Sequence, residues 1–285
     1  MSTSTVSGQA APVPRTEPRA RFRHLLVAEW IKLWSLRSTY GVLVTGALLS
    51  IGICANSARA NVHLIAASPD PGAGTAIDSL HSAFVPEAYE ILMLIAAGVG
   101  AVTVFGEYAS GLIRTTFAAV PDRRAVMAAK TVVVAATMLA FGAVVSIASF
   151  GLTQAIYDGQ GIGLSISAPG ALRAVTASAL LAPLSALVGM ALGALIRHGA
   201  GTVVAAVGVL LLLPILFQGE TYRWVKEIGN ATPLIAWDAL TDNPAKPPPF
   251  PGRYPETITE AWIVFGTWPL VAAAIAVIVV HRRDL

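Results

Sequence analysis

The sequence predicts an all-α membrane protein: a bundle of about six transmembrane helices preceded by an N-terminal amphipathic helix in the membrane interface. Of the 285 residues, 55% are hydrophobic and only 12% are charged, about half the charged share of a typical soluble domain. The apolar residues also come in six long uninterrupted runs, which is the pattern of spanning helices. Strands of an outer-membrane barrel would alternate polar and apolar residues instead.

The order of these segments predicts a short tail followed by one transmembrane domain. Residues 1–23 are rich in Ser, Thr, Pro and Arg and are predicted to form a disordered cytoplasmic tail rather than a signal peptide. Residues 24–285 are predicted to form one transmembrane domain. Its expected spans cover about 40–58, 88–105, 131–152, 174–196, 200–217 and 261–280, each near the ~20 residues that cross ~30 Å of hydrocarbon.

The segment from His24 to Arg37 predicts the interfacial helix. Its apolar side chains recur at helical spacing and include Trp30, Leu33 and Trp34. Tryptophan suits the headgroup level of a membrane, so we expect this face to meet lipid and the opposite face, with Glu29 and Lys32, to meet water. A plain cytoplasmic lead-in to the first span is the alternative.

The orientation follows from the basic residues. With the N-terminus inside, thirteen Lys and Arg residues fall in inner segments and six in outer segments, which obeys the positive-inside rule. Both termini are therefore predicted to be cytoplasmic. The long outer segment from Gln218 to Glu260 contains too many apolar residues for a free linker, and we expect short helices at the outer interface there.

Several chemistries are excluded by the motifs. The chain has no P-loop, no His-Glu-x-x-His zinc helix and no Gly-x-Ser-x-Gly nucleophile elbow. Cys54 is the single cysteine, and the five histidines are scattered. We therefore expect no catalytic residue, no metal and no cofactor in this chain, and we assign its net charge of +3 to membrane topology rather than to nucleic-acid binding.

The most informative segment is the predicted cytoplasmic loop between the second and third spans, from Phe105 to Lys130. Glu107 directly follows an apolar helix, Gly111 gives backbone freedom, and Arg114 lies seven residues beyond Glu107. The apolar residues around Arg114 predict a short helix. This pattern fits a docking element for a cytoplasmic partner and fits an ordinary positive-inside loop equally well.

A resemblance favours docking. The segment Glu107-Tyr-Ala-Ser-Gly-Leu-Ile-Arg-Thr-Thr, after two spans and before a Pro-Asp-Arg-Arg stretch, resembles the permeases of ABC-2-type transporters. The segment Glu29-Trp-Ile-Lys-Leu-Trp-Ser-Leu-Arg-Ser-Thr is similar to the start of bacterial drug and antibiotic exporter permeases of that family. The resemblance extends over the chain beyond its tail.

The resemblance implies a multi-pass permease subunit in the cell membrane, without enzymatic activity of its own. A separate ABC ATPase would hydrolyse ATP, and a second permease subunit, identical or different, would complete the translocation path. In this family the first cytoplasmic loop is the coupling helix, a role carried over to Glu107, Gly111, Arg114 and Thr115. The substrate stays open.

Two rival functions and two further features accompany this interpretation. A stand-alone secondary transporter or channel would place charges or broken helices near the midplane, and a membrane-embedded enzyme would need paired titratable groups; the predicted spans have neither. Glu87 and Glu90 are candidates for lining a path, although they fall at the outer boundary. The Gly189-x-x-x-Gly193 motif permits a close helix contact, within the chain or between subunits.

Overall fold

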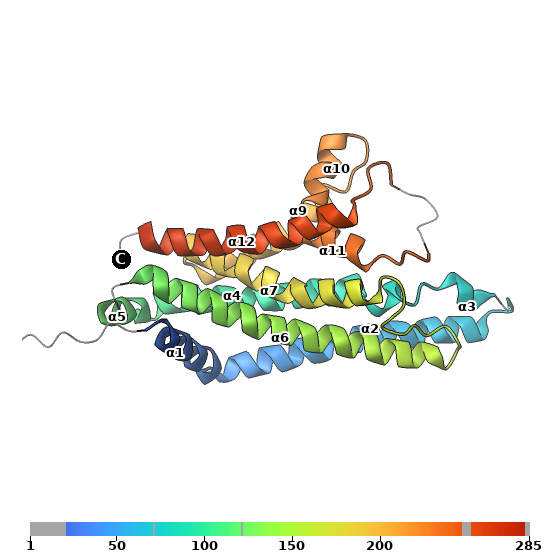
Figure 1. Cartoon of the computed structure of the whole chain (residues 1–285), viewed down its shortest axis with the longest axis horizontal. Coiled ribbons are helices and arrows are strands. Elements are labelled where there is room, and N and C mark those ends of the chain that lie inside the picture. Colours follow the sequence, from blue (N-terminus) through green and yellow to red (C-terminus); the bar gives the residue numbers. More distant parts are fainter. Residues whose placement is uncertain (1–20, 71, 121, 247–251, 283–285) are drawn as a thin grey trace, which may run out of the picture.

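The computed structural model describes residues 21–70, 72–120, 122–246 and 252–282, and within these ranges every regular element is helical (Figure 1). Six helical segments are long and apolar enough to cross a membrane. The predicted all-α membrane bundle is therefore confirmed for the described residues. Most of the predicted tail, residues 1–20, lies outside them, and the first helix already begins at Phe22.

The spans overlap all six predicted runs. They are α2 (Arg37–Ala67), α4 (Pro86–Ala109), α6 (Arg123–Asp158), α7 (Ala171–Ile196), the continuous segment of α8 (Gly199–Val207), η2 (Gly208–Leu212) and α9 (Leu213–Leu216), and α12 (Ile258–Arg282). Helices α2 and α6 have 31 and 36 residues, so they are ~46 and ~54 Å long and extend well past their apolar parts. At their far ends Asn61 Nδ2 donates to Tyr157 Oη at 2.9 Å.

Helix α7 lies at the centre of the bundle and packs against α4, α6 and α12. Its crossing with α4 is very close: a Cβ on Gly189 would lie 2.0 Å from the Ala97 carbonyl oxygen, and one on Gly100 would lie 1.9 Å from that of Ala186. Gly193 also faces α4, at Ala101. The Gly189-x-x-x-Gly193 motif thus serves a contact inside the chain.

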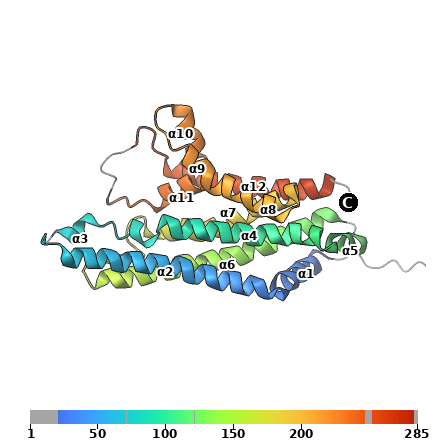
Figure 2. The same cartoon turned by 180° about the vertical axis from the view of Figure 1, so that it is seen from behind.

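The two ends of the bundle differ (Figures 1 and 2). The α1 end carries α1 (Phe22–Ser35), α5 (Leu112–Ala119) and the last turn of α12, whereas the α11 end carries α3 (Ala73–Ala76), η1 (His81–Ala83), α10 (Arg223–Asn230) and α11 (Pro233–Thr241).

Helices α10 and α11 are the short helices expected between Gln218 and Glu260. Helix α11 also packs into the bundle, because Trp237 is fully buried, stacks on Tyr89 at 4.9 Å and donates from Nε1 to Ser178 Oγ at 3.0 Å.

Candidate functional site

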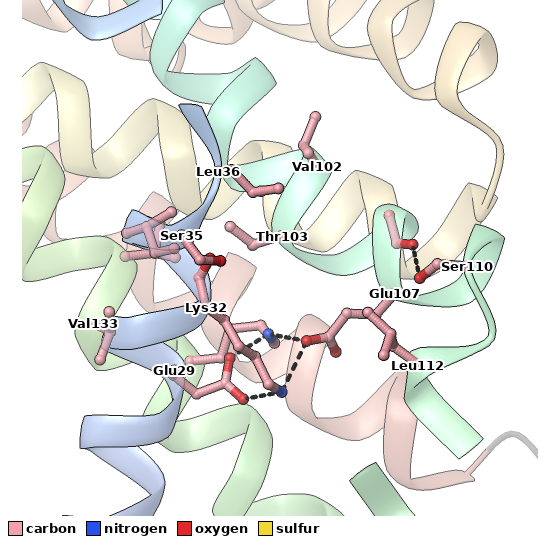
Figure 3. Close-up of a pocket in the computed structure, with 14 residues that line it drawn as sticks. Glu29, Lys32, Ser35, Leu36, Val102, Thr103, Glu107, Ser110, Leu112 and Val133 are labelled. Carbon is pink, nitrogen blue, oxygen red and sulfur yellow. Dashed lines mark hydrogen bonds and ion pairs between the residues drawn. The ribbon is translucent and has the colours of Figure 1, made fainter. Parts of the chain in front are cut away.

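Three segments that are far apart in the sequence meet at the α1 end: the middle of α1, the last turns of α4 and the first turns of α6. Helix α1 ends at Ser35 because Leu36 is extended, with φ −83° and ψ 113°, and the chain resumes as α2 at Arg37. We call this bend the elbow. It places α1 against α6 and beside the end of α4, where Figure 3 shows the side chains gathered.

Four charged side chains form the centre of the site, and we call Glu29, Lys32, Glu107 and Lys130 the charge quartet. Lys32 Nζ donates to Glu29 Oε1 at 2.8 Å and to Glu107 Oε1 at 3.0 Å. Lys130 Nζ donates to Glu107 Oε1 at 2.8 Å and also to Glu29 Oε2. Each ammonium group therefore bridges both carboxylates, so α1, α4 and α6 are joined by one network (Figure 3).

The charge quartet is mostly out of solvent. The side chains of Lys130 and Glu29 are 4% and 5% exposed, that of Glu107 is 13% exposed, and that of Lys32 is 38% exposed. Buried ions are costly unless each finds a partner, and here two cations offset two anions. Burial disfavours the charged form of Lys32, but the hydrogen bonds and charges of Glu29 and Glu107 outweigh it and raise the pKa of Lys32.

Helix α5 is attached directly beside the charge quartet. Gly111, between α4 and α5, has φ 73°, a left-handed conformation that favours glycine, so the backbone freedom expected of it is used for a sharp turn. Phe117 is 8% exposed and lies under the Arg123 guanidinium, 5.3 Å from the ring centroid. Leu112, in contrast, is 55% exposed, so α5 has an outward apolar residue and an inward anchor.

The other residues of the predicted coupling segment have different surroundings. Thr115 is exposed and its hydroxyl donates to the Leu112 carbonyl oxygen at 2.9 Å, within α5. Arg114 belongs to α5, but its side chain lies outside the described part of the structure. Glu107, expected to orient the loop, pairs with two lysines from α1 and α6.

The predicted orientation of α1 is wrong in part. Glu29 was expected to face water but is buried in the charge quartet, and Leu33 was expected to face lipid but is only 5% exposed. The reason is that the helix packs its Glu29–Leu33 side on the bundle. Trp30 is 49% exposed, and Trp34 lies between the Trp30 ring at 5.6 Å and the Tyr40 ring at 4.9 Å, so an aromatic group does cover the elbow.

An apolar groove, which we call the elbow groove, leads from the charge quartet along α4. It consists of two adjoining hollows of about 360 and 270 Å³. Both are lined by Leu33, Leu36, Val102 and Thr103. The first hollow reaches Lys32 and Glu107 (Figure 3), and the second continues past Gly98 to Ile95, with Val203 of α8 on its other side.

Glu87 and Glu90 lie far from the charge quartet, in the first turns of α4 at the α11 end. Glu87 is exposed and Glu90 half-buried, whereas Ala88 and Tyr89 between them are fully buried. The two carboxylates are thus on the outward side of α4, and whether that side lines a path stays a prediction.

Sequence reasoning missed the charge quartet, because its members are separated by up to 101 positions. A usable signal existed: Lys130 interrupts a long apolar run, and such a residue needs an anionic partner. Comparison with known proteins adds no further guide, since no protein-family model and no curated protein matches this sequence. The resemblance therefore rests on the quoted segments.

Proposed function

We propose that this chain is the permease subunit of an ATP-driven ABC exporter, and that α5 is the helix that receives a separate ATPase subunit. The observation that carries the proposal is the charge quartet at the base of α5, because it joins the interfacial helix and two spans at the point where a partner would push. A second permease subunit, identical or different, would complete the translocation path.

The proposal requires the α1 end to be cytoplasmic. The described acidic residues at this end have partners within the chain. Glu29 and Glu107 form ion pairs in the charge quartet, and Asp122 caps α6 by accepting from the Ala125 N–H at 3.0 Å. The exposed residues at this end include Arg21, Arg23, Arg37 and Arg124, which supports a cytoplasmic assignment under the positive-inside rule.

Reporter fusions test the orientation. Fusions after Arg124 and Arg197 should report inside, and fusions after Asp158 and Lys246 should report outside. A cytoplasmic signal after Lys246 would contradict the topology and, with it, the docking of an ATPase on α5.

The coupling route follows from the contacts. Helix α5 joins α4 through the Gly111 turn and contacts the start of α6 through Phe117 and Arg123. A displacement of α5 would therefore act on α4 and α6 together, and the charge quartet would pass it to α1. Since the quartet is neutral as a whole and each member is paired, it can move as a unit without exposing a buried charge.

The decisive experiment replaces residues of α5 and of the quartet. We expect Arg114→Ala and Glu107→Ala to insert into the membrane normally but to lower co-purification of the ATPase, transport and permease-stimulated ATP hydrolysis. Arg23→Ala, on the exposed side of α1, is the matched control and should leave all three unchanged.

Leu112→Ser separates docking from stability, because Leu112 is 55% exposed and serine removes its apolar surface without adding a charge beside the quartet, whose hollow Leu112 lines. It should weaken ATPase binding while the thermal midpoint stays at the wild-type value. Normal stimulation of the ATPase by the Arg114 and Leu112 variants would refute docking on α5. Transport by the purified chain without any ATPase would favour a secondary transporter instead.

A further inference from the structure

The elbow groove has the length of one membrane leaflet. Its lining on α4 runs from Ile95 to Glu107, which is ~18 Å at 1.5 Å per residue. Half of a ~30 Å hydrocarbon core is ~15 Å. The groove therefore begins near the headgroup level, at the charge quartet, and ends near the middle of the bilayer.

The groove is also open toward the surroundings of the bundle. Leu36, Val102 and Val203 line it and are 48%, 44% and 54% exposed. Figure 2 shows α4 running between α2 and α8, and the exposed Val102 and Val203 belong to α4 and α8. At this depth in a membrane an apolar channel is filled by hydrocarbon rather than by water, because its walls offer water almost no hydrogen-bonding partners.

The end of the groove at the elbow is cationic. Lys32 is the most exposed member of the charge quartet, and both carboxylates are turned inward on the lysines. Arg37, between the lining residues Leu36 and Ser38, is exposed as well. Glu29 and Glu107 line the first hollow as well, but Lys32 and Lys130 offset them, so Arg37 leaves a net positive charge beside this end of the groove.

We propose that the elbow groove is a binding site for an anionic phospholipid of the surrounding leaflet. One acyl chain lies along α4 from Val102 to Ile95, and the headgroup phosphate meets Lys32 and Arg37. Basic sites next to spanning helices select anionic headgroups in this way. The site rests on the membrane fold and on the groove, not on the docking of an ATPase.

The test uses the full chain, purified in detergent and stripped of lipid, with phosphatidylglycerol and phosphatidylcholine of identical acyl chains as probes in native mass spectrometry. Gly98→Leu fills the groove, because a Cβ at Gly98 meets no atom within 4 Å. Gly266→Leu in α12 is the matched control, since Gly266 is equally open but lies away from the groove.

We expect the wild type to bind phosphatidylglycerol about fivefold more tightly than phosphatidylcholine, as one net positive charge beside the groove implies. Gly98→Leu should weaken both lipids by about tenfold or more, whereas Gly266→Leu should bind like the wild type. Arg37→Gln should lower the preference for phosphatidylglycerol by about fivefold. It should weaken phosphatidylglycerol more than phosphatidylcholine, because both lipids carry the phosphate but only phosphatidylcholine carries a compensating choline cation.

Two results would overturn the proposal. Equal binding by the Gly98→Leu and Gly266→Leu variants would place the lipid elsewhere, and equal binding of the two lipids to the wild type would remove the anionic selectivity. If Gly98→Leu does not fold, as judged by its thermal midpoint, Val102→Phe blocks the junction of the two hollows instead. No ATPase takes part, so failure here is distinct from failure of the coupling proposal.

Discussion

Replacing Lys130 by methionine tests whether the charge quartet stabilises the α1 end. Methionine keeps much of the side-chain length and removes the charge. The Lys130 ammonium is 4% exposed and donates to both Glu29 and Glu107. Its loss turns a neutral quartet into a triad with one excess negative charge in a nearly water-free site.

The cost can be bounded from the geometry. Removing one partner of a buried ion pair costs roughly 3–5 kcal/mol. Lys32 stays 2.8 and 3.0 Å from the two carboxylates, so we expect the lower end, about 3 kcal/mol. For a chain of this size that lowers the thermal midpoint by roughly 6–12 °C.

The assay is unfolding in detergent micelles, followed by circular dichroism and by denaturant titration. Arg223→Met is the control, because Arg223 pairs with Glu227 one turn away through side chains that are 75% and 57% exposed and such surface pairs contribute little; its midpoint should not change measurably. A Lys130→Met midpoint equal to that of the wild type would show that the quartet adds nothing to stability.

Two further predictions concern a carboxyl group and a helix crossing. Both Glu256 oxygens are buried without a hydrogen-bond partner, and burial, with the nearby charge of Glu260, raises the pKa of Glu256 from 4.5 to about 8. The folded state therefore binds the proton more tightly than the unfolded state, so stability falls as pH rises from about 4.5 to 8. Glu256→Gln should raise the thermal midpoint at pH 9 much more than at pH 5, and an equal gain at both pH values would contradict this. Gly189→Ala should lower the free energy of unfolding by about 1–3 kcal/mol, because its Cβ meets the α4 backbone. Gly98→Ala, on open α4 surface, should leave the free energy of unfolding unchanged or raise it by up to about 1 kcal/mol. Similar values for the two variants would exclude the close crossing.

The spans were predictable because one local property decides them. A run of about 20 apolar residues in lipid must be helical, since its backbone groups find no other partners. The expected runs at 88–105 and 174–196 thus lie within α4 and α7. The ends were less predictable: α2 and α6 continue to Ala67 and Asp158, where helix-forming residues extend the helix beyond its apolar core.

The orientation of α1 was not predictable in the same way, because it depends on a contact between distant segments. Helical spacing correctly separates Trp30 from Glu29 and Lys32, but it does not say which side meets the bundle. A lone amphipathic helix would turn its charges to water. Lys130, brought alongside by α6, makes burial of Glu29 favourable instead, and this reverses the assignment.

This reversal bears on the proposed coupling. If α1 only floated in the interface with its charges in water, a displacement of α5 would reach the spans through α4 and α6 alone. With Glu29 and Lys130 paired, a movement of α6 away from α1 would break this buried ion pair. Glu29 would then keep only Lys32 as a partner, and Lys130 only Glu107, so the separation costs free energy and α1 tends to follow α6. Lipid in the elbow groove would then lie against a helix that moves with α5. Bound lipid and docked partner would accordingly influence one another through α1, by equal factors in both directions.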